Sequence, residues 1–362
     1  MQRVCDLLES AVVPTVAPAQ QIRLFRESAS ILKKTSEYSD CDDELNNRFI
    51  AAVLQVVNVF FSLLGGSDRS VRTAALDFIQ LAWSKATEGH REILNVSLQQ
   101  AWSLVLSDSL IDTEALHTTS SRAMDSPQFA GLLISLLESP IMGRQLISSN
   151  IQATLSRLLD GFDIAHKAIR DAADANYNPN EQVIDATHYL LQSTIAVVSK
   201  LPVAVQRVDS TIIDRLMEKS LLLVNESFLT YANRILSGLL TATLIAYRIP
   251  ADLPDWFIRI ITQDDVASEK ISKTEDATLI MLSGLLHVIQ PQMLVSSIPG
   301  SDEQMIDVVY KRILKSIQSS NEPHIHILAF GTYARMFGVL KGLIKKDLLK
   351  DKNAERLVQI SN

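Results

Sequence analysis

The chain has 362 residues, of which 47% are hydrophobic and 21% charged, a balance typical of a folded protein and not of a disordered one. With only 12 glycines and 11 prolines, it has too few turn-forming residues for an all-β sandwich or a glycine-loop α/β enzyme. The formal net charge of −7 gives the chain as a whole no electrostatic attraction to nucleic acid or to anionic membranes.

Apolar residues recur at helical spacing from the first residues onward. Two short stripes, around residues 7–12 and 22–32, precede an acidic link that begins a long helix at 43–64. Residues 49–66 carry no charge and are long enough for a short membrane span. Because Gln55, Asn58 and Ser62 place one polar stripe on this segment, we instead predict a helix buried between neighbours.

The same periodicity continues to the C-terminus. It predicts helices at 68–87, 90–107, 109–117, 127–138, 143–159, 161–174, 181–200, 209–224, 227–247, 253–262, 275–290, 302–319, 323–345 and 352–360. The Asn-, Asp- and Pro-rich segment 174–180 predicts a loop, which is the candidate for an internal boundary. Alternation with period two never lasts more than a few residues, so we expect an all-α fold.

A short motif at residues 67–79 indicates how the helices are paired. Asp68 is followed by Val71-Arg72 and by Ala74-Ala75-Leu76, and this order resembles the second half of a HEAT repeat. In such a repeat, Asp68 lies near a helix N-terminus, where it caps the helix or meets the dipole. The resemblance implies that Arg72 bonds the turn of the neighbouring repeat.

A weaker copy of this motif lies near the C-terminus. Glu322-Pro323 begins a helix, because proline is favoured at the first helical position. His326 occupies the position of the arginine, which puts the usual contact between repeats in doubt.

A second sequence similarity gives the interval between repeats. Ile235-Leu-Ser-Gly238-Leu-Leu resembles Met281-Leu-Ser-Gly284-Leu-Leu at a distance of 46 residues, and Gly331 follows 47 residues later. Two helices in 40–47 residues is the range of armadillo and HEAT repeats. The resemblance predicts a single α-solenoid over residues 1–362, made of stacked antiparallel helix pairs; the alternative is an irregular helical bundle.

Such a solenoid implies a non-catalytic scaffold, adaptor or regulatory subunit that binds one or more proteins along its surface. The sequence contains no phosphate loop, dinucleotide fingerprint, nucleophile elbow or paired-histidine metalloprotease motif. We therefore expect no enzymatic activity, no cofactor and no bound metal.

The C-terminal region offers candidate residues for partner binding. Its basic members are Arg335, Lys341, Lys345, Lys346, Lys350 and Lys352. They indicate either a solvated helix end or a contact with RNA, DNA or an acidic protein. The alternative function is therefore an RNA-binding accessory protein, for example the partner of a tRNA-modifying enzyme. Trp256, at the start of a predicted helix, is a candidate surface anchor, with the core as the other interpretation.

The cysteines and the N-terminal residues indicate the cellular compartment. Cys5 and Cys41 are too few for a disulfide framework. Asp6 and Glu9 interrupt the segment where a signal peptide would have its apolar core. We expect a protein of the cytoplasm or the nucleus, without a membrane span.

Overall fold

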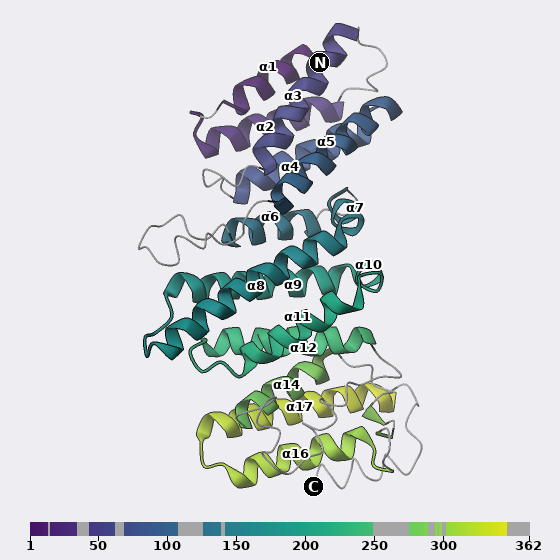
Figure 1. The fold of residues 1–362 in the computed structure, drawn as a ribbon. Coiled ribbons are helices and arrows are strands. Elements are labelled where there is room, and N and C mark those ends of the chain that lie inside the picture. Colours follow the sequence, from purple (N-terminus) through teal and green to yellow (C-terminus); the bar gives the residue numbers. More distant parts are fainter. Residues whose placement is uncertain are drawn as a thin grey trace. The chain divides into compact units, whose positions relative to one another are not determined.

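The structure is a computed structural model that describes residues 1–13, 15–34, 43–61, 69–107, 126–138, 142–248, 275–288, 294–295, 297–298 and 302–345. Within these residues the fold is all-α, as predicted (Figure 1). β pairing among them is limited to an isolated bridge between Ser297 and Gln304. The predicted helices at 109–117, 253–262 and 352–360 lie outside the described residues.

The helices within the described residues have the following order along the chain. They are α1 Gln2–Ala11, α2 Pro18–Lys34, α3 Asp43–Phe61, α4 Arg69–Lys85, α5 Glu88–Ser107, α6 Ser126–Glu138, α7 Met142–Ser149, α8 Ile151–Asp174, α9 Glu181–Lys200, α10 Pro202–Val205, α11 Ser210–Val224, α12 Tyr231–Arg248, α14 Glu275–Val288, α16 Met305–Ser319 and α17 Pro323–Lys345. The chain divides into two compact units, Met1–Ile164 and Ala165–Asn362, and the division falls inside α8. The loop 174–180 therefore lies within the second unit.

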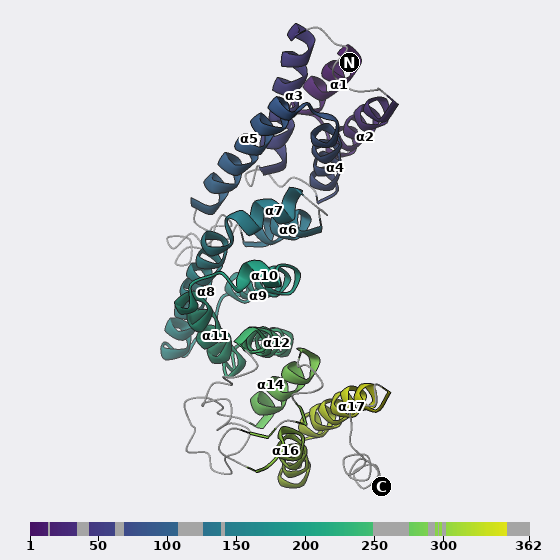
Figure 2. The ribbon, with the colours of Figure 1, turned by 90° about the vertical axis from the view of Figure 1, so that its right-hand side faces the viewer.

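The helices of the first unit form two layers (Figure 2). Helices α2, α4 and α6 contact one another in that order, and helices α1, α3, α5 and α7 do the same. The layers contact each other through α1 with α2, α3 with α4 and α6 with α7. Consecutive helices among those described thus lie in opposite layers.

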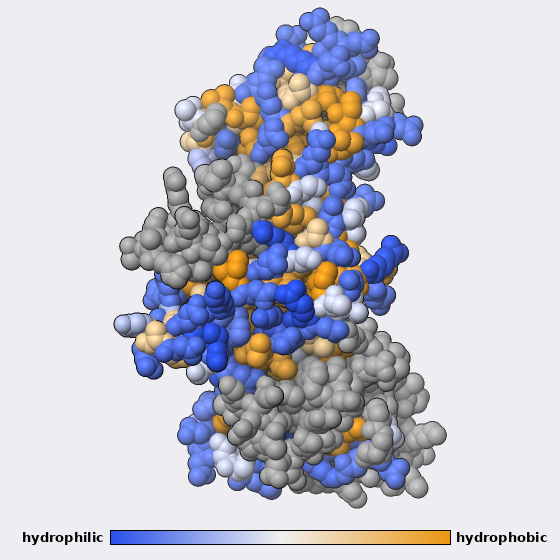
Figure 3. Space-filling model, in the orientation of Figure 1, coloured by the Kyte–Doolittle hydropathy of each residue, from blue (hydrophilic) through white to orange (hydrophobic). Residues whose placement is uncertain are grey.

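Aromatic side chains fill the space between the helices of the first unit. Trp102 of α5 is fully buried and stacks on Phe129 of α6, with ring centroids 5.8 Å apart. Phe61 of α3 lies 6.3 Å from the same indole ring. Elsewhere on this unit, hydrophobic patches reach the surface among hydrophilic side chains (Figure 3).

The uncharged segment predicted as a buried helix becomes α3. Its buried residues, from Phe49 to Phe61, recur at helical spacing and face the other helices of the unit. None of the helices that the structure describes combines the length and the apolar character that crossing a membrane requires.

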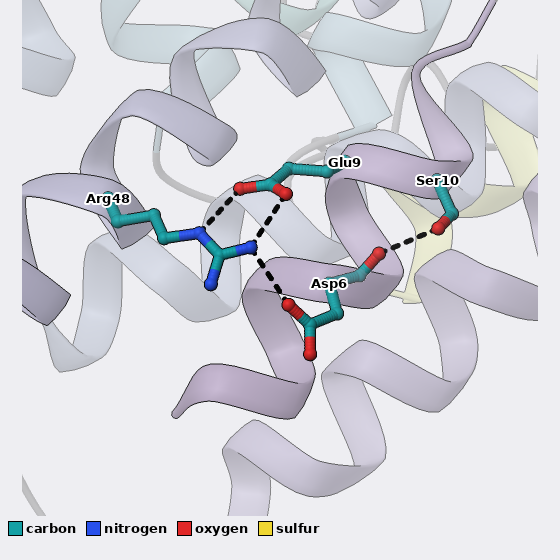
Figure 4. Close-up of polar contacts among 4 residues, drawn as sticks. All are labelled: Asp6, Glu9, Ser10 and Arg48. Carbon is teal, nitrogen blue, oxygen red and sulfur yellow. Dashed lines mark hydrogen bonds and ion pairs between the residues drawn. The ribbon is translucent and has the colours of Figure 1, made fainter.

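Arg48 of α3 binds two carboxylates of α1 at the surface of the first unit (Figure 4). Arg48 donates from Nε and Nη2 to the two carboxylate oxygens of Glu9, at 2.8 and 2.7 Å, and from Nη2 to Asp6 at 2.8 Å. This bidentate hydrogen bond lowers the pKa of the Glu9 carboxyl below its ordinary value. The same carboxylates raise the pKa of the Arg48 guanidinium.

The second unit also contains a layer of helices in chain order. Helices α9, α12, α14 and α17 contact one another in succession, α11 packs on α12, and α16 packs on α17 (Figures 1 and 2). Asn233 joins α9 to α12, because its Nδ2 donates to the carbonyl of Ile184 at 3.0 Å. Its Oδ1 lies 2.7 Å from Nδ1 of His188, which donates this hydrogen bond.

The loop predicted at 174–180 is confirmed. Helix α8 ends at Asp174, and Asn176 adopts a left-handed conformation with φ of 59°, which asparagine tolerates better than most residues. Asn180 then caps α9 by accepting a hydrogen bond from the amide of Gln182 at 3.0 Å.

Two predicted boundaries are wrong. Helices at 143–159 and 161–174 were expected, but the break lies at Asn150, whose Nδ2 donates to Gln99 at 2.7 Å and to the carbonyl of Leu146 at 3.0 Å. The helix expected at 227–247 begins instead at Tyr231. The hydroxyl of Thr230 accepts a hydrogen bond from the amide of Asn233 at 3.3 Å, as a helix cap does. Apolar periodicity continues through both breaks and cannot locate them.

Candidate binding groove

Two glycines bring α12 and α14 into backbone contact. A Cβ placed on Gly284 would lie 2.8 Å from the carbonyl oxygen of Gly238, and one placed on Gly238 would lie 2.5 Å from Cγ2 of Ile280. Neither position has room for a side chain. These are the glycines of the repeated Leu-Ser-Gly-Leu-Leu sequence, so the repeat places equivalent residues of two helices against each other.

A largely buried ion pair fixes the same two helices near their N-terminal ends. Arg234 of α12 lies 2.7 Å from Asp276 of α14, and each side chain is exposed by no more than 13%. Nε of Arg234 also donates to the carbonyl of Val224 at 2.7 Å. Arg234 with Asp276 and Gly238 with Ile280 pair residues about 42 apart, so α12 and α14 run in the same direction.

Helix α17 lies on the other side of α14, also in the same direction. Leu328 packs against a buried cluster that includes Ala277, Ile280 and Met281. Two turns further along α17, Nη1 of Arg335 donates to the carbonyl of Ser283 at 3.3 Å. Three parallel helices from successive parts of the chain therefore share one surface.

This surface contains a groove with a volume of about 330 Å³. Its α12 side is formed by Tyr231, Ile235 and Leu239, its α14 side by Ile280, Ser283, Gly284 and His287, and its α17 side by Ile327, Leu328, Gly331 and Arg335. The volume lies at the lower end of the range of ligand-binding pockets. The lining is mainly aliphatic, so the groove suits an apolar side chain.

Large apolar side chains lie exposed at the groove and beside it. Ile327 is 74% exposed, and Phe330 of the same helix is 58% exposed. Ile235, on the opposite side of the groove, is 41% exposed. Single exposed apolar residues are common, whereas a contiguous group beside a groove marks an interaction surface.

The groove has one permanently charged residue among its described lining residues, Arg335. Tyr231 lies at the opposite end. Burial, followed by the negative charge of Asp276, raises the pKa of the Tyr231 phenol, so this residue remains a neutral hydrogen-bonding group at neutral pH. The arrangement can bind an apolar group and a negative charge together.

The side chain of Arg72 lies against the next helix of its layer, at a position inside that helix and not at a turn. This side chain is buried, and Nη2 lies 2.8 Å from the position of a Cβ on Gly131 of α6. The arginine of α4 thus reaches the next helix of its layer. Asp68, the first residue of the motif, lies outside the described residues.

At the C-terminal copy, the contacts stay local. Nε2 of His326 lies 2.6 Å from the carbonyl of Ser320 in the turn between α16 and α17. Glu322 is exposed, its amide bonds the hydroxyl of Ser320 at 3.1 Å, and its carboxylate lies 3.8 Å from His324. The described contacts of His326 therefore tie α17 to its own turn.

The candidate partner-binding residues separate into two groups. Arg335 belongs to the groove, and Lys341 is exposed on the same helix. The side chain of Lys345 and the whole of Lys346, Lys350, Lys352 and Trp256 lie outside the described residues. RNA binding by the basic segment stays a prediction.

Sequence reasoning missed the groove itself. Ile235, Leu239 and Ile280 read as ordinary core residues, because periodicity shows that a face is apolar and not what covers it. One signal was present: α17 carries apolar residues on nearly every side, including Ile327, Phe330 and Phe337. A helix that is apolar all round needs contacts on more than one face.

Comparison of the chain with protein-family models, with curated proteins and with solved structures finds no match.

Proposed function

We propose that this chain is a non-catalytic interaction subunit, built as an α-solenoid of armadillo/HEAT type, which binds a partner protein in the groove between α12, α14 and α17. The observation that carries the proposal is the parallel alignment of these three helices, which exposes apolar side chains around a groove with one cationic residue. A surface of this kind recognises another macromolecule through shape and apolar contact.

The order of contacts within each unit supports the solenoid. In the first unit, alternate helices pack on one another in chain order, and in the second unit α9, α12, α14 and α17 form one such layer, as in stacked helix pairs. The glycines at 238 and 284 occupy equivalent places in successive pairs, which supports a period of about 46 residues.

Small-angle X-ray scattering tests the architecture. A compact globule of 362 residues has a radius of gyration of about 21 Å. A solenoid of the same length gives a clearly larger value. A measured radius near that of the globule would contradict the solenoid and leave the irregular bundle.

Affinity purification with mass spectrometry tests the function. We expect the wild-type chain to retain a specific protein partner that is lost from Gly331→Trp, because no atom lies within 4 Å of a Cβ at Gly331 and the indole would occupy the groove. Gly89→Trp is the control, since position 89 on α5 has equally open space. A partner retained equally by both variants would place binding elsewhere.

A further inference from the structure

The groove is a trough whose floor is α14 and whose walls are α12 and α17. Ile280 on α14 is only 2% exposed, whereas Ile235 on α12 and Ile327 on α17 are 41% and 74% exposed. Gly284 leaves the floor without a side chain, because the backbone of α12 occupies that space. Gly331 leaves the α17 wall open, with no atom within 4 Å of a Cβ there.

The length of the trough fits a short segment of chain. The lining positions run from 231 to 239 on α12, from 280 to 287 on α14 and from 327 to 335 on α17. Eight residues of helix extend about 12 Å, so the walls match two to three turns of a docked helix. Such a helix places apolar side chains at positions i, i+3 or i+4, and i+7.

The walls select a helix over an extended peptide. Apart from Tyr231, which begins α12, and His287 in the last turn of α14, the residues that line the trough lie inside their helices, where backbone groups bond within the same helix. An extended occupant would bury amide and carbonyl groups with few backbone partners, which is costly. A helical occupant satisfies its own backbone and needs only side-chain contacts.

The positive charge of the trough favours an occupant that carries a negative charge near one end. Arg335 is the permanent charge among the described lining residues, and none of these residues is acidic. Its guanidinium donates to the Ser283 carbonyl at 3.3 Å, a long hydrogen bond that leaves other donors of the fork to bind a carboxylate. Lys341, further along α17, adds positive charge in the same direction.

We propose that the trough binds an amphipathic helix of a partner protein, which places a row of apolar side chains over Ile280 and an Asp or Glu against Arg335. This inference rests on the proposed function and names the kind of partner. The exposed Phe330 and Phe337 extend the apolar contact along α17, outside the trough.

A peptide-display selection on the purified full-length chain tests the inference. Two libraries are used: random 16-residue peptides, and 16-residue peptides on a helix-favouring Ala/Glu/Lys background with seven randomised positions on one face. Peptides that also bind Gly331→Trp are removed by counter-selection. Synthetic versions of the selected sequences are then measured by fluorescence anisotropy against wild type, Arg335→Glu, Gly331→Trp and Gly89→Trp.

We expect enriched peptides to carry apolar residues at i, i+3 or i+4, and i+7, with a carboxylate at one end of the row. Arg335→Glu should weaken them by about tenfold or more, and Gly331→Trp should abolish binding. Selection on Arg335→Glu should return Lys or Arg in place of the acid. Gly89→Trp should bind like wild type, which shows that an added indole alone does not interfere.

The outcomes separate the two proposals. Groove-dependent peptides that are proline-rich, extended or indifferent to Arg335→Glu would overturn the helix inference and leave the groove as a protein-binding site. Enriched peptides that all bind Gly331→Trp would overturn the groove as the site. A concentration-dependent dimer in light scattering that is lost in Gly331→Trp would make a second copy the occupant and overturn the inference as well.

Discussion

The two units fill the space between their helices with different side chains. In the first unit, the largest fully buried side chains are aromatic: Trp102, Phe25, Phe49, Phe60, Phe78, Phe129 and Phe162. In the second unit, the layer of α9, α12, α14 and α17 buries small ones, including Thr187, Ser193, Thr194, Ser237, Thr241, Thr278 and Thr332, together with Gly238 and Gly284. The first unit packs mainly through rings, apart from a close approach of Gly143 of α7 to the backbone of Leu136 of α6, and the second packs through small side chains and close backbone approach.

Several buried hydroxyls of the second unit bond within their own helix. Thr187 bonds the carbonyl of Val183 at 2.8 Å, and Ser237 bonds that of Asn233 at 2.9 Å, each four residues earlier. The hydroxyl is thereby satisfied within its own helix and acts as a small side chain. The comparison therefore predicts that, away from Gly143, the first unit is most sensitive to removing atoms and the second to adding them.

Trp102→Ala should have the largest effect, because it removes the ring that stacks on Phe129 and contacts Phe61. The cavity and lost burial should lower the free energy of unfolding by about 4 kcal/mol. Urea unfolding followed by circular dichroism measures the change. Leu104→Ala, on the same helix at 68% exposure, should change it by less than about 0.5 kcal/mol. A Trp102→Ala loss under about 1 kcal/mol would contradict the aromatic core.

Arg234→Ala should come next, since it leaves the Asp276 carboxylate largely buried without its ion pair. We expect a loss of about 3 kcal/mol. Hydrogen exchange should assign the weakening to α12 and α14. The control is Arg3→Ala, which breaks an exposed pair with Glu27 and should cost less than about 1 kcal/mol. Equal losses of stability in the two variants would mean that the buried ion pair stabilises the fold no more than the exposed one.

Gly284→Ala adds one methyl group where the backbone of Gly238 lies 2.8 Å away. The helices must separate, which should cost about 1–3 kcal/mol despite the better helix propensity of alanine. Gly131→Ala in the first unit meets only the flexible end of Arg72, so it should lie within about 1 kcal/mol of wild type. Thermal unfolding of Gly284→Ala and Gly131→Ala measures the two losses of stability. A larger loss for Gly131→Ala would contradict the contrast between the two units.

The smallest effect concerns pH and the surface of the first unit. Arg48 lowers the folded-state pKa of Glu9 below its ordinary value of 4.5, so this stabilisation is complete above that value and is lost as the pH falls through the lowered pKa. Urea midpoints between pH 6 and 2.5 should therefore fall less steeply for Glu9→Gln than for wild type. Identical slopes would show that the contact between Arg48 and Glu9 does not contribute to stability.

The second unit offers the matched pH control. The amide and hydroxyl of Thr211 lower the pKa of Asp209, the cap of α11, so this contribution is also lost on acidification. Asp209→Asn keeps the cap and removes the titration. It should flatten the pH dependence of the second unit, observed by hydrogen exchange in α11, and leave α1 and α3 unchanged.

Much of the fold could be predicted because helices leave local signals. The apolar spacing of residues 49–61 predicted α3, and the composition of 174–180 predicted a loop. The break at Asn150 was missed because it depends on Gln99, 51 residues earlier. The groove was missed for the same reason, since Ile235 and Ile327 are distant in sequence and look like core residues.

The arginine and the histidine at equivalent positions of the two motif copies make different contacts. Arg72 reaches Gly131 inside the next helix of its layer, whereas the motif implies a bond to the turn of the neighbouring repeat, which stays a prediction. His326 bonds Ser320 instead, because an imidazole is shorter than a guanidinium side chain. Arg335 was named for its charge alone, and its place in the groove became clear only from the contact with Ser283.

The sequence by itself determined that the chain is helical, where its central loop lies and at what interval its glycines recur, because these depend on the backbone and on neighbours within a few residues. Tertiary packing alone decided which glycines touch, which apolar residues stay uncovered and which cation borders them. Those properties depend on residues about 40 to 50 positions apart on separate helices, and no local pattern specifies how such helices meet.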